Sequence, residues 1–336
     1  MPHSMPPEEA VERYLAERKP EVSSSTLRNH RYALKRFLEW TDEAGVEDIS
    51  KLNGFHIHDF KMYRRETSDV NEVTLRNNLS VIRVFTRWLE SMEAIEGDIA
   101  DKIQIPNPDE DARDEKIERE TAHNILEYLT KYEYASLRHV LFALLWDTGF
   151  RLGTVRALDL EDYHSEEQYV EVKHRPDEDT PLKNKGEAER EVNLHDWVCE
   201  AIDDYIEINR PDVEDDYGRK PLITTQHGRP AGTNLRQNIN ALTRPCHYTN
   251  ECPHDREIDE CEAAGGYNQA QRCPSSVPPH TIRRSAITAW LNDGFAKELL
   301  SGRMNVRPST LDKHYDARTE SEKRELRREA FDMNEE

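Results

Sequence analysis

Six basic or aromatic side chains between residues 151 and 315 are of the types that act on phosphate groups. Arg151 follows an apolar stretch that stops at Gly149, and His280 and Arg283 are spaced to share one face of a helix. Guanidinium groups suit phosphate oxygens, histidine is a candidate base, and a tyrosine hydroxyl can attack phosphorus. Each residue alone has an ordinary structural explanation, so only the set points to phosphoryl transfer. The set consists of Arg151, Lys183, Lys185, His280, Arg283 and Tyr315.

Four cysteines within 28 residues could bind a metal ion. They are Cys246, Cys252, Cys261 and Cys273. In an intracellular chain such clustering favours a metal over disulfides, and four thiolates would complete a tetrahedral zinc site. His254 or His247 could replace one thiolate. The spacings of 6, 9 and 12 differ from the CxxC pattern, so free buried cysteines in an insertion are the alternative. We expect such a zinc ion to be structural and to take no part in catalysis.

Residues 1–105 read as helices without strands. Pro6 and Pro7 open a first helix, the serines at 23–25 supply an N-cap for a second, and a third follows around Phe60. Spacings of 4, 3, 3 and 4 between apolar residues predict a fourth helix. Those apolar residues are Leu75, Leu79, Ile82, Phe85 and Leu89.

Two of these helices carry basic faces, and no acidic residue lies between Val73 and Leu89. A basic face can simply be solvated, but two of them in an acidic chain favour a surface that binds the phosphates of DNA. The cations are Arg28, Arg31 and Lys35 in the second helix and Arg76, Arg83 and Arg87 in the fourth.

A linker rich in Pro, Asp, Glu and Arg precedes a region of mixed secondary structure. A long apolar helix runs over 137–145, and two strand-like runs flank the polar turn that holds the two lysines, which predicts a hairpin. The strand-like runs are 169–173 and 191–194. Further helices are expected near 121–129, 197–208, 234–242, 281–291, 297–300 and 310–315.

The chain is strongly acidic: its 336 residues hold 46 Lys+Arg against 67 Asp+Glu, a formal net charge of -21. This balance alone argues against a nucleic-acid partner, which usually requires a basic footprint. Surplus acid with only 14 lysines, however, resembles proteins from organisms with molar internal salt, where the Debye length falls to about 3 Å. An ordinary acidic protein is the alternative. The sequence has no apolar run near the roughly 18 residues of a membrane span and no signal-peptide core, so we expect a cytoplasmic protein without a membrane partner.

Familiar nucleotide and protease motifs are missing from the sequence. It has no glycine-rich loop that ends in Lys-Ser/Thr, no GxGxxG and no HExxH. Taken in order, the motifs it does have resemble the tyrosine recombinase (phage integrase) family, in particular Xer-like members from halophilic archaea. In the catalytic part they are Thr148-Gly149-Phe150-Arg151 with Leu158 and Asp162, Lys183-Asn184-Lys185-Gly186 with Arg190-Glu191-Val192, His280-Thr281-Ile282-Arg283, and His314-Tyr315. In the N-terminal part they are Thr26, Tyr32, Phe37 and Trp40, then Thr74, Leu79, Phe85, Trp88 and Leu89.

The resemblance implies a mainly α fold with a small β component. A four-helix, SAM-like core-binding domain that clamps DNA would be joined to a mixed α/β catalytic domain. The implied boundaries are 1–105 for the first domain, 106–118 for the linker, 119–318 for the catalytic domain with a Cys-rich insertion at 246–273, and 319–336 for a charged tail helix.

The resemblance also implies a reaction. Tyr315 would attack the scissile phosphate of double-stranded DNA and form a covalent 3'-phosphotyrosine, without metal, ATP or another catalytic cofactor, and release a 5'-hydroxyl. Arg151 and Arg283 would neutralise the pentavalent transition state, as Mg²⁺ does in many other phosphoryl transferases. His280 is the candidate base, and a lysine would protonate the leaving oxygen. The family works as a tetramer on DNA, so a homotetramer is expected.

Three positions depart from the common family pattern or leave a choice. Arg303 stands where the family usually has histidine or tryptophan, and it can still donate hydrogen bonds to a phosphate oxygen. Thr154 replaces the acidic residue that usually follows the first arginine. The commonest spacing back from Val192 selects Lys185 as the catalytic lysine, whereas the run that begins at Pro181 resembles halophilic relatives and selects Lys183, which we prefer.

Two rival hypotheses remain beside a site-specific recombinase. The departures at Arg303 and Thr154 suggest a DNA-binding regulator that has this fold and no longer cuts. A type IB topoisomerase-like enzyme would use the same chemistry as a monomer, although the HxxR motif and the N-terminal match favour a recombinase.

Overall fold

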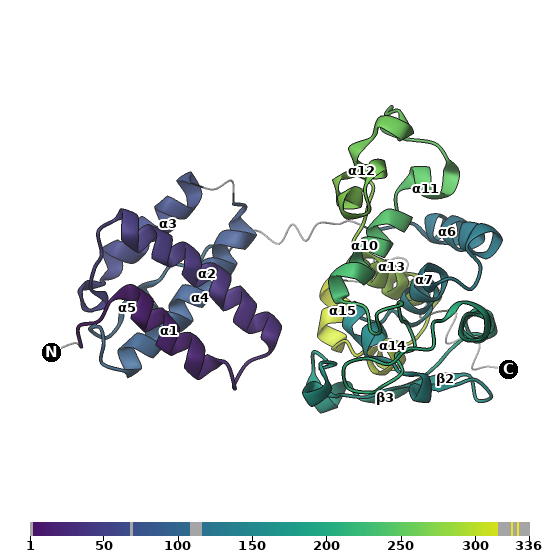
Figure 1. Ribbon diagram of the computed structural model, residues 1–336, viewed down its shortest axis with the longest axis horizontal. Coiled ribbons are helices and arrows are strands. Elements are labelled where there is room, and N and C mark those ends of the chain that lie inside the picture. Colours follow the sequence, from purple (N-terminus) through teal and green to yellow (C-terminus); the bar gives the residue numbers. More distant parts are fainter. Residues whose placement is uncertain (1–2, 68–69, 108–115, 315–323, 325–327, 329–336) are drawn as a thin grey trace. The chain divides into compact units, whose positions relative to one another are not determined.

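The computed structural model describes residues 3–67, 70–107, 116–314, 324 and 328. The chain divides into two compact units, Met1–Asp114 and Glu115–Glu336, each with a hydrophobic core of its own (Figure 1). The boundary falls inside the segment 106–118, which the sequence analysis assigned to a linker. The expected tail helix at 319–336 lies outside the described residues apart from 324 and 328.

The first unit packs its helices around aromatic side chains. The helices are α1 (Pro7–Arg18), α2 (Ser24–Glu43), α3 (Gly54–Glu66), α4 (Glu72–Ser91) and α5 (Ile99–Lys102). Ser23 caps α2 by accepting a hydrogen bond from the backbone N–H of Thr26 at 3.2 Å. Phe37 of α2 packs edge-on against Phe85 of α4, with ring centroids 5.9 Å apart. The five apolar residues predicted for the inner face of α4 are each 1% exposed or less, which confirms that helix.

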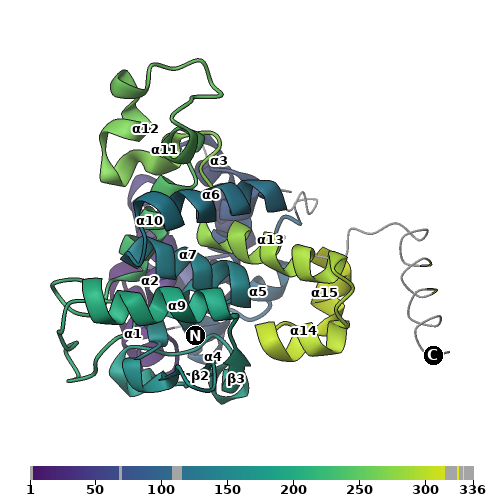
Figure 2. The same ribbon diagram turned by 90° about the vertical axis from the view of Figure 1, so that its right-hand side faces the viewer.

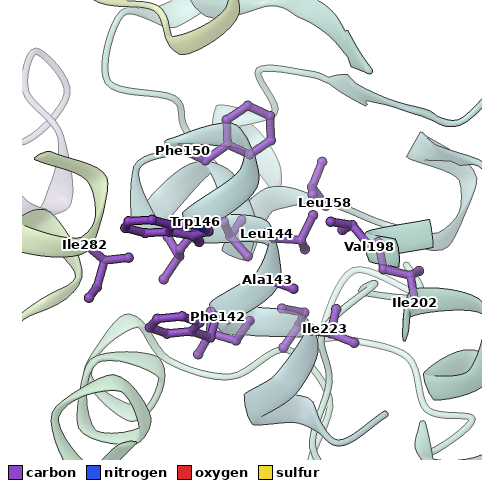
Figure 3. Close-up of a cluster of buried hydrophobic side chains, with 14 of the residues drawn as sticks. Phe142, Ala143, Leu144, Trp146, Phe150, Leu158, Val198, Ile202, Ile223 and Ile282 are labelled. Atoms are coloured by element: carbon purple, nitrogen blue, oxygen red, sulfur yellow. The ribbon is translucent and has the colours of Figure 1, made fainter. Parts of the chain in front are cut away.

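The second unit is built around one buried helix, α7. Its helices are α6 (Arg119–Tyr132), α7 (Leu137–Thr148), α8 (Leu152–Ala157), α9 (Asp196–Asp204), α10 (Gly232–Leu242), α11 (Pro245–Thr249), α12 (Glu262–Gly265), α13 (Pro279–Asn292), α14 (Lys297–Met304) and α15 (Pro308–His314). Every residue from 140 to 145 in α7 is fully buried. Figure 3 shows Ile282 of α13 on one side of α7 and Val198 and Ile202 of α9 on the other. A helix that is apolar on all faces packs against neighbours on every side, so the C-terminal end of α7 is held in a fixed position.

The described residues form a three-stranded antiparallel sheet in the order β1-β2-β3. The strands are β1 (Tyr163–His164), β2 (Tyr169–Val172) and β3 (Arg190–Asn193). The predicted hairpin is confirmed as β2 and β3, with Val170 opposite Val192, and β3 starts one residue earlier than expected. The sequence analysis missed β1, which is only two residues long.

A small apolar cluster fastens the last described helices to α13. It contains Leu291, Leu300, Met304 and Leu311, and Figure 2 shows α14 and α15 beside the end of α13. The Cys-rich insertion lies at the other end of the unit: in both views α11 and α12 lie far from β2 and β3 (Figures 1 and 2). None of the helices in the described ranges has the length and apolar character needed to cross a bilayer.

Candidate active site

The chain turns sharply at the C-terminal end of α7 because Gly149 adopts a left-handed conformation. Its φ of 61° is one that glycine adopts at little cost. A Cβ atom at this position would lie 3.2 Å from the side chain of Met304, so glycine also lets the end of α14 approach. Phe150 is fully buried and anchors the turn in the core, and Arg151 follows as the N-cap of α8.

Two arginines far apart in the sequence are held around this turn. Arg283, only 2% exposed, donates hydrogen bonds to the carbonyl oxygens of Gly149 at 2.5 Å and Met304 at 2.9 Å. Arg151 donates to the carbonyl oxygen of Asn305 at 3.1 Å. A main-chain carbonyl orients a guanidinium group without neutralising it, so these bonds fix the direction of two positive charges.

His280 lies in the first turn of α13, one turn before Arg283, as the sequence predicts. Partial burial of its ring lowers the pKa of His280 below its ordinary value of 6.5, and the nearby charges of Arg283, Arg151, Lys183 and Arg284 lower that pKa further. The residue still has an exposed surface. At neutral pH His280 is therefore an uncharged imidazole that can accept a proton.

Both candidate lysines, Lys183 and Lys185, are exposed on the loop between β2 and β3. The loop is tied to Asn305, whose side-chain oxygen accepts a hydrogen bond from the Asn184 amide and whose own amide donates to the carbonyl of Glu187 at 3.2 Å. Asn305 has a φ of 48° just after α14, and its carbonyl also holds the first arginine. The sequence analysis missed Asn305, although an asparagine directly after a helix is a known C-cap signal.

The contacts of Arg303 differ from those expected of a residue that serves only to donate hydrogen bonds to a phosphate. Its two terminal nitrogens donate to the carbonyl oxygen of Asn193 at 2.7 Å and to the carboxylate of Asp147 at 3.2 Å. The guanidinium carbon lies 5.3 Å from the centroid of the Trp290 ring, and the buried Asp147 also accepts a hydrogen bond from His195. Only Nε of Arg303 has no hydrogen-bond partner in the part of the chain that the structure describes. The side chain thus joins α7, β3, α13 and α14.

Arg190, at the start of β3, belongs to the same cluster of cations, and the sequence analysis gave it no role. Its Nε donates to the carbonyl oxygen of Arg303 at 2.9 Å and its Nη1 to that of Ala188 at 2.6 Å. Its guanidinium carbon lies 5.0 Å from the centroid of the Phe150 ring. Among the described residues it has no carboxylate partner. The sequence did contain one indication of this role, because Arg190 is a basic residue directly before the strand predicted at 191–194.

Tyr315 lies outside the described residues, one position after the end of α15. Leu311 of α15 is buried in the cluster that also holds Leu300 and Met304 of α14. The buried Leu311 thus holds α15 against α14, the helix that carries Arg303, and Tyr315 is the next residue in the sequence after α15. Thr154, at the position where the family usually has an acid, is 8% exposed, and its N–H donates to the carbonyl of Arg151 at 2.8 Å.

The six cations predicted to face DNA fall into two groups. The unpaired group is exposed and forms no ion pair within the described ranges. It contains Arg28, Arg31, Lys35 and Arg76. In the second group, Arg83 donates to the carbonyl oxygen of Ile103, and Arg87 forms an ion pair with Asp101 at 2.9 Å. Asp101 of α5 thus neutralises one of the three charges on the basic face of α4.

The four clustered cysteines line one small cavity of about 10 Å³, together with His254. Their thiols are free, as is that of Cys199 in α9. His247 lies elsewhere, because its Nε2 is 3.1 Å from the carboxylate of Glu133. No group of three or more His, Cys, Asp or Glu side chains in the described residues has the arrangement of a ready-made metal site.

Comparison with known proteins agrees with this architecture. The phage integrase N-terminal SAM-like domain family matches residues 11–93. The tyrosine recombinase XerD of Mycobacterium tuberculosis is 24% identical over 209 residues, which cover 57% of this chain and 62% of that protein. The match thus spans less than two thirds of that relative. XerD of Corynebacterium glutamicum is 22% identical over 281 residues and 81% of each chain.

Solved structures show the same fold. The Tn1549 transposon integrase in complex with transposon right end DNA is 15% identical, with a TM-score of 0.69 over 97% of this chain and 100% of that chain. The lambda integrase in a dimer bound to a COC' core site is 11% identical, with a TM-score of 0.64 over 95% of this chain and 80% of that chain. Together these comparisons show that the chain is similar to tyrosine recombinases and phage integrases in sequence and that it shares the fold of the solved integrases.

Proposed function

We propose that the protein is a site-specific DNA recombinase that cuts and rejoins DNA through a covalent 3'-phosphotyrosine, without metal or ATP. One observation carries the proposal: Arg151 lies around the turn at Gly149 together with His280 and Arg283, although it precedes both by more than a hundred residues in the sequence. Fixed guanidinium groups beside a neutral imidazole are the groups that metal-free phosphoryl transfer requires.

The proposed roles follow the movement of charge and protons. The hydroxyl oxygen of Tyr315 bonds to phosphorus as His280 takes its proton, and the bond from phosphorus to the 5' oxygen breaks. Arg151 and Arg283 stabilise the negative charge on the pentavalent phosphorus. The leaving oxygen receives a proton from a lysine, so atoms and charge balance and the reverse sequence rejoins the strand.

We propose Lys183 rather than Lys185 as this proton donor. Lys183 is among the charges that lower the pKa of His280, so it lies near the imidazole. Lys185 instead begins a short 3-10 helix, Lys185–Ala188, with a φ of 51°. For Arg303 we propose that it supports the site through its hydrogen bond to the carboxylate of Asp147.

The proposed partner is double-stranded DNA, and the proposed assembly is a homotetramer on that DNA. Two observations support the DNA partner: the exposed cations of α2, and the DNA in the solved integrase structures of this fold.

Covalent trapping tests the proposal. Full-length protein is incubated in molar KCl with nicked duplexes that were first selected for binding from a random-sequence pool, and the products are separated on denaturing gels. The wild type is expected to give a protein–DNA adduct that disappears in Tyr315→Phe and persists in Tyr132→Phe, a matched control on the exposed surface of α6. Tight binding without any adduct would favour the regulator. A protein that forms the adduct and also relaxes supercoiled plasmid, without exchanging strands between duplexes, would favour the topoisomerase.

A further inference from the structure

We propose that Cys246, Cys252, Cys261 and Cys273 bind one zinc ion that holds the insertion at 246–273 in shape. This site is independent of the DNA chemistry proposed above. It is carried by where the fold brings the four cysteines and by how little else stabilises the segment around them.

The four thiols reach one cavity from four different local structures. Cys246 lies in α11, Cys252 in the following loop, Cys261 between the 3-10 helix Ile258–Glu260 and α12, and Cys273 at the end of the 3-10 helix Tyr267–Arg272. The cavity of about 10 Å³ has room for roughly one water-sized sphere, and thus for a single ion. Unrelated cysteines separated by 6, 9 and 12 positions have no reason to line the same cavity.

The insertion has almost no hydrophobic core. Among its described residues only Ala263, Ala270 and Cys273 are buried. Neither alanine joins the core cluster built around α7. Small segments with so little buried apolar surface usually depend on a disulfide or a metal ion for their shape. No disulfide links these cysteines, so a metal is the stabilising element that their arrangement allows.

The donor set fits zinc and favours four thiols. Zinc takes tetrahedral sulfur ligands at about 2.3 Å. His254, the alternative ligand, also lines the cavity, and its Nε2 lies 2.9 Å from the Ser275 hydroxyl oxygen, which leaves only its Nδ1 as a ligand atom. His247 does not line the cavity. The described side chains do not form a closed site, so zinc would draw the four sulfur atoms together as it replaces the thiol protons.

The insertion is already joined at its base, which limits what the metal would affect. The backbone N–H of Val277 donates to the hydroxyl of Thr243 at 3.0 Å, and the Ser276 hydroxyl donates to the carbonyl of Asn240 at 2.8 Å. These two hydrogen bonds hold residues 276 and 277, which lie between the insertion and α13, the helix that carries His280. Loss of zinc should therefore loosen 246–273 strongly and the phosphate site only weakly.

Metal analysis of the full-length protein, purified without chelators, tests the site. About one equivalent of zinc is expected in the wild type and in Cys199→Ser, the matched control in α9. Less than about half an equivalent is expected in Cys246→Ser and Cys261→Ser. Because a variant could fail through misfolding, the wild type is also exchanged with Co²⁺, and thiolate-to-cobalt charge-transfer absorption is expected.

Three results would overturn the proposal: wild-type protein with under half an equivalent and no such absorption, disulfides among the four cysteines by mass spectrometry, or zinc lost in His254→Ala but kept in Cys252→Ser. The covalent trapping of DNA is a separate readout, so failure of one proposal does not imply failure of the other.

Discussion

Arg190 is a partly buried cation that lies close to three other arginines. Burial, followed by the charges of Arg283, Arg151 and Arg303, lowers the pKa of Arg190 to about 10. That repulsion is relieved when an anion enters the cluster, so part of the anion affinity should depend on Arg190. We expect sulfate to raise the thermal unfolding midpoint of the wild type, to raise it less in Arg190→Met, and to act almost normally on the control Arg190→Lys. Equal sulfate effects in all three proteins would show that Arg190 serves packing alone.

His280 gives the reaction a defined acidic limit. Since partial burial and the neighbouring cations lower its pKa below 6.5, the imidazole stays neutral, and so able to accept a proton, to lower pH than an ordinary histidine. The rate of adduct formation should therefore fall to half of its plateau value only below pH 6.5, the ordinary pKa of histidine. Single-turnover rates across this range check the expectation, with His280→Asn as the variant that cannot titrate. A wild-type rate that already halves near pH 7, or an identical acidic fall in His280→Asn, would contradict this role.

At the level of elements, the basic face of α2 differs from that of α4. Arg31 is exposed with no ion pair in the described chain, whereas Arg87 of α4 is paired with Asp101. If α2 faces DNA, Arg31→Gln should change the slope of log affinity against log salt by about one, the share of one phosphate contact. Arg87→Gln, equal in charge change, should leave the slope nearly unaltered. Binding titrations over a KCl series measure both, and unchanged slopes in both variants would place the DNA on another face.

Helices with a long apolar face could be predicted from the sequence because their periodicity survives any tertiary context. The four N-terminal helices are examples. The continuous apolar run of α7 and the strand-like runs of the β2–β3 hairpin could also be predicted. Short elements such as α8, α11 and α12 carry too few residues for a period to show. At the site, resemblance supplied Arg151, His280 and Arg283, and the structure brings them together. Arg190 and Asn305 each carry a local signal in the sequence, but their hydrogen bonds through main-chain carbonyls link distant segments, so their place in the site emerges only from the fold.

For the whole molecule, the formal charge of -21 sets an unusual dependence on salt. An ordinary DNA-binding protein loses affinity as salt rises, because the counterions that it displaces from DNA enter a more concentrated solution and their release gains less entropy. Here long-range repulsion between an acidic surface and DNA should dominate at 0.1 M KCl, where the Debye length is about 10 Å, and vanish near 1 M, where it is about 3 Å. We therefore expect DNA binding, adduct yield and the unfolding midpoint all to rise toward molar KCl. Sorbitol at equal osmolality is the matched control, because it does not screen charge and should not reproduce the rise. Full activity at 0.1 M KCl would contradict adaptation to high salt, yet it would leave the recombinase chemistry untouched, since that chemistry depends on the cations around Gly149 and not on the surface charge.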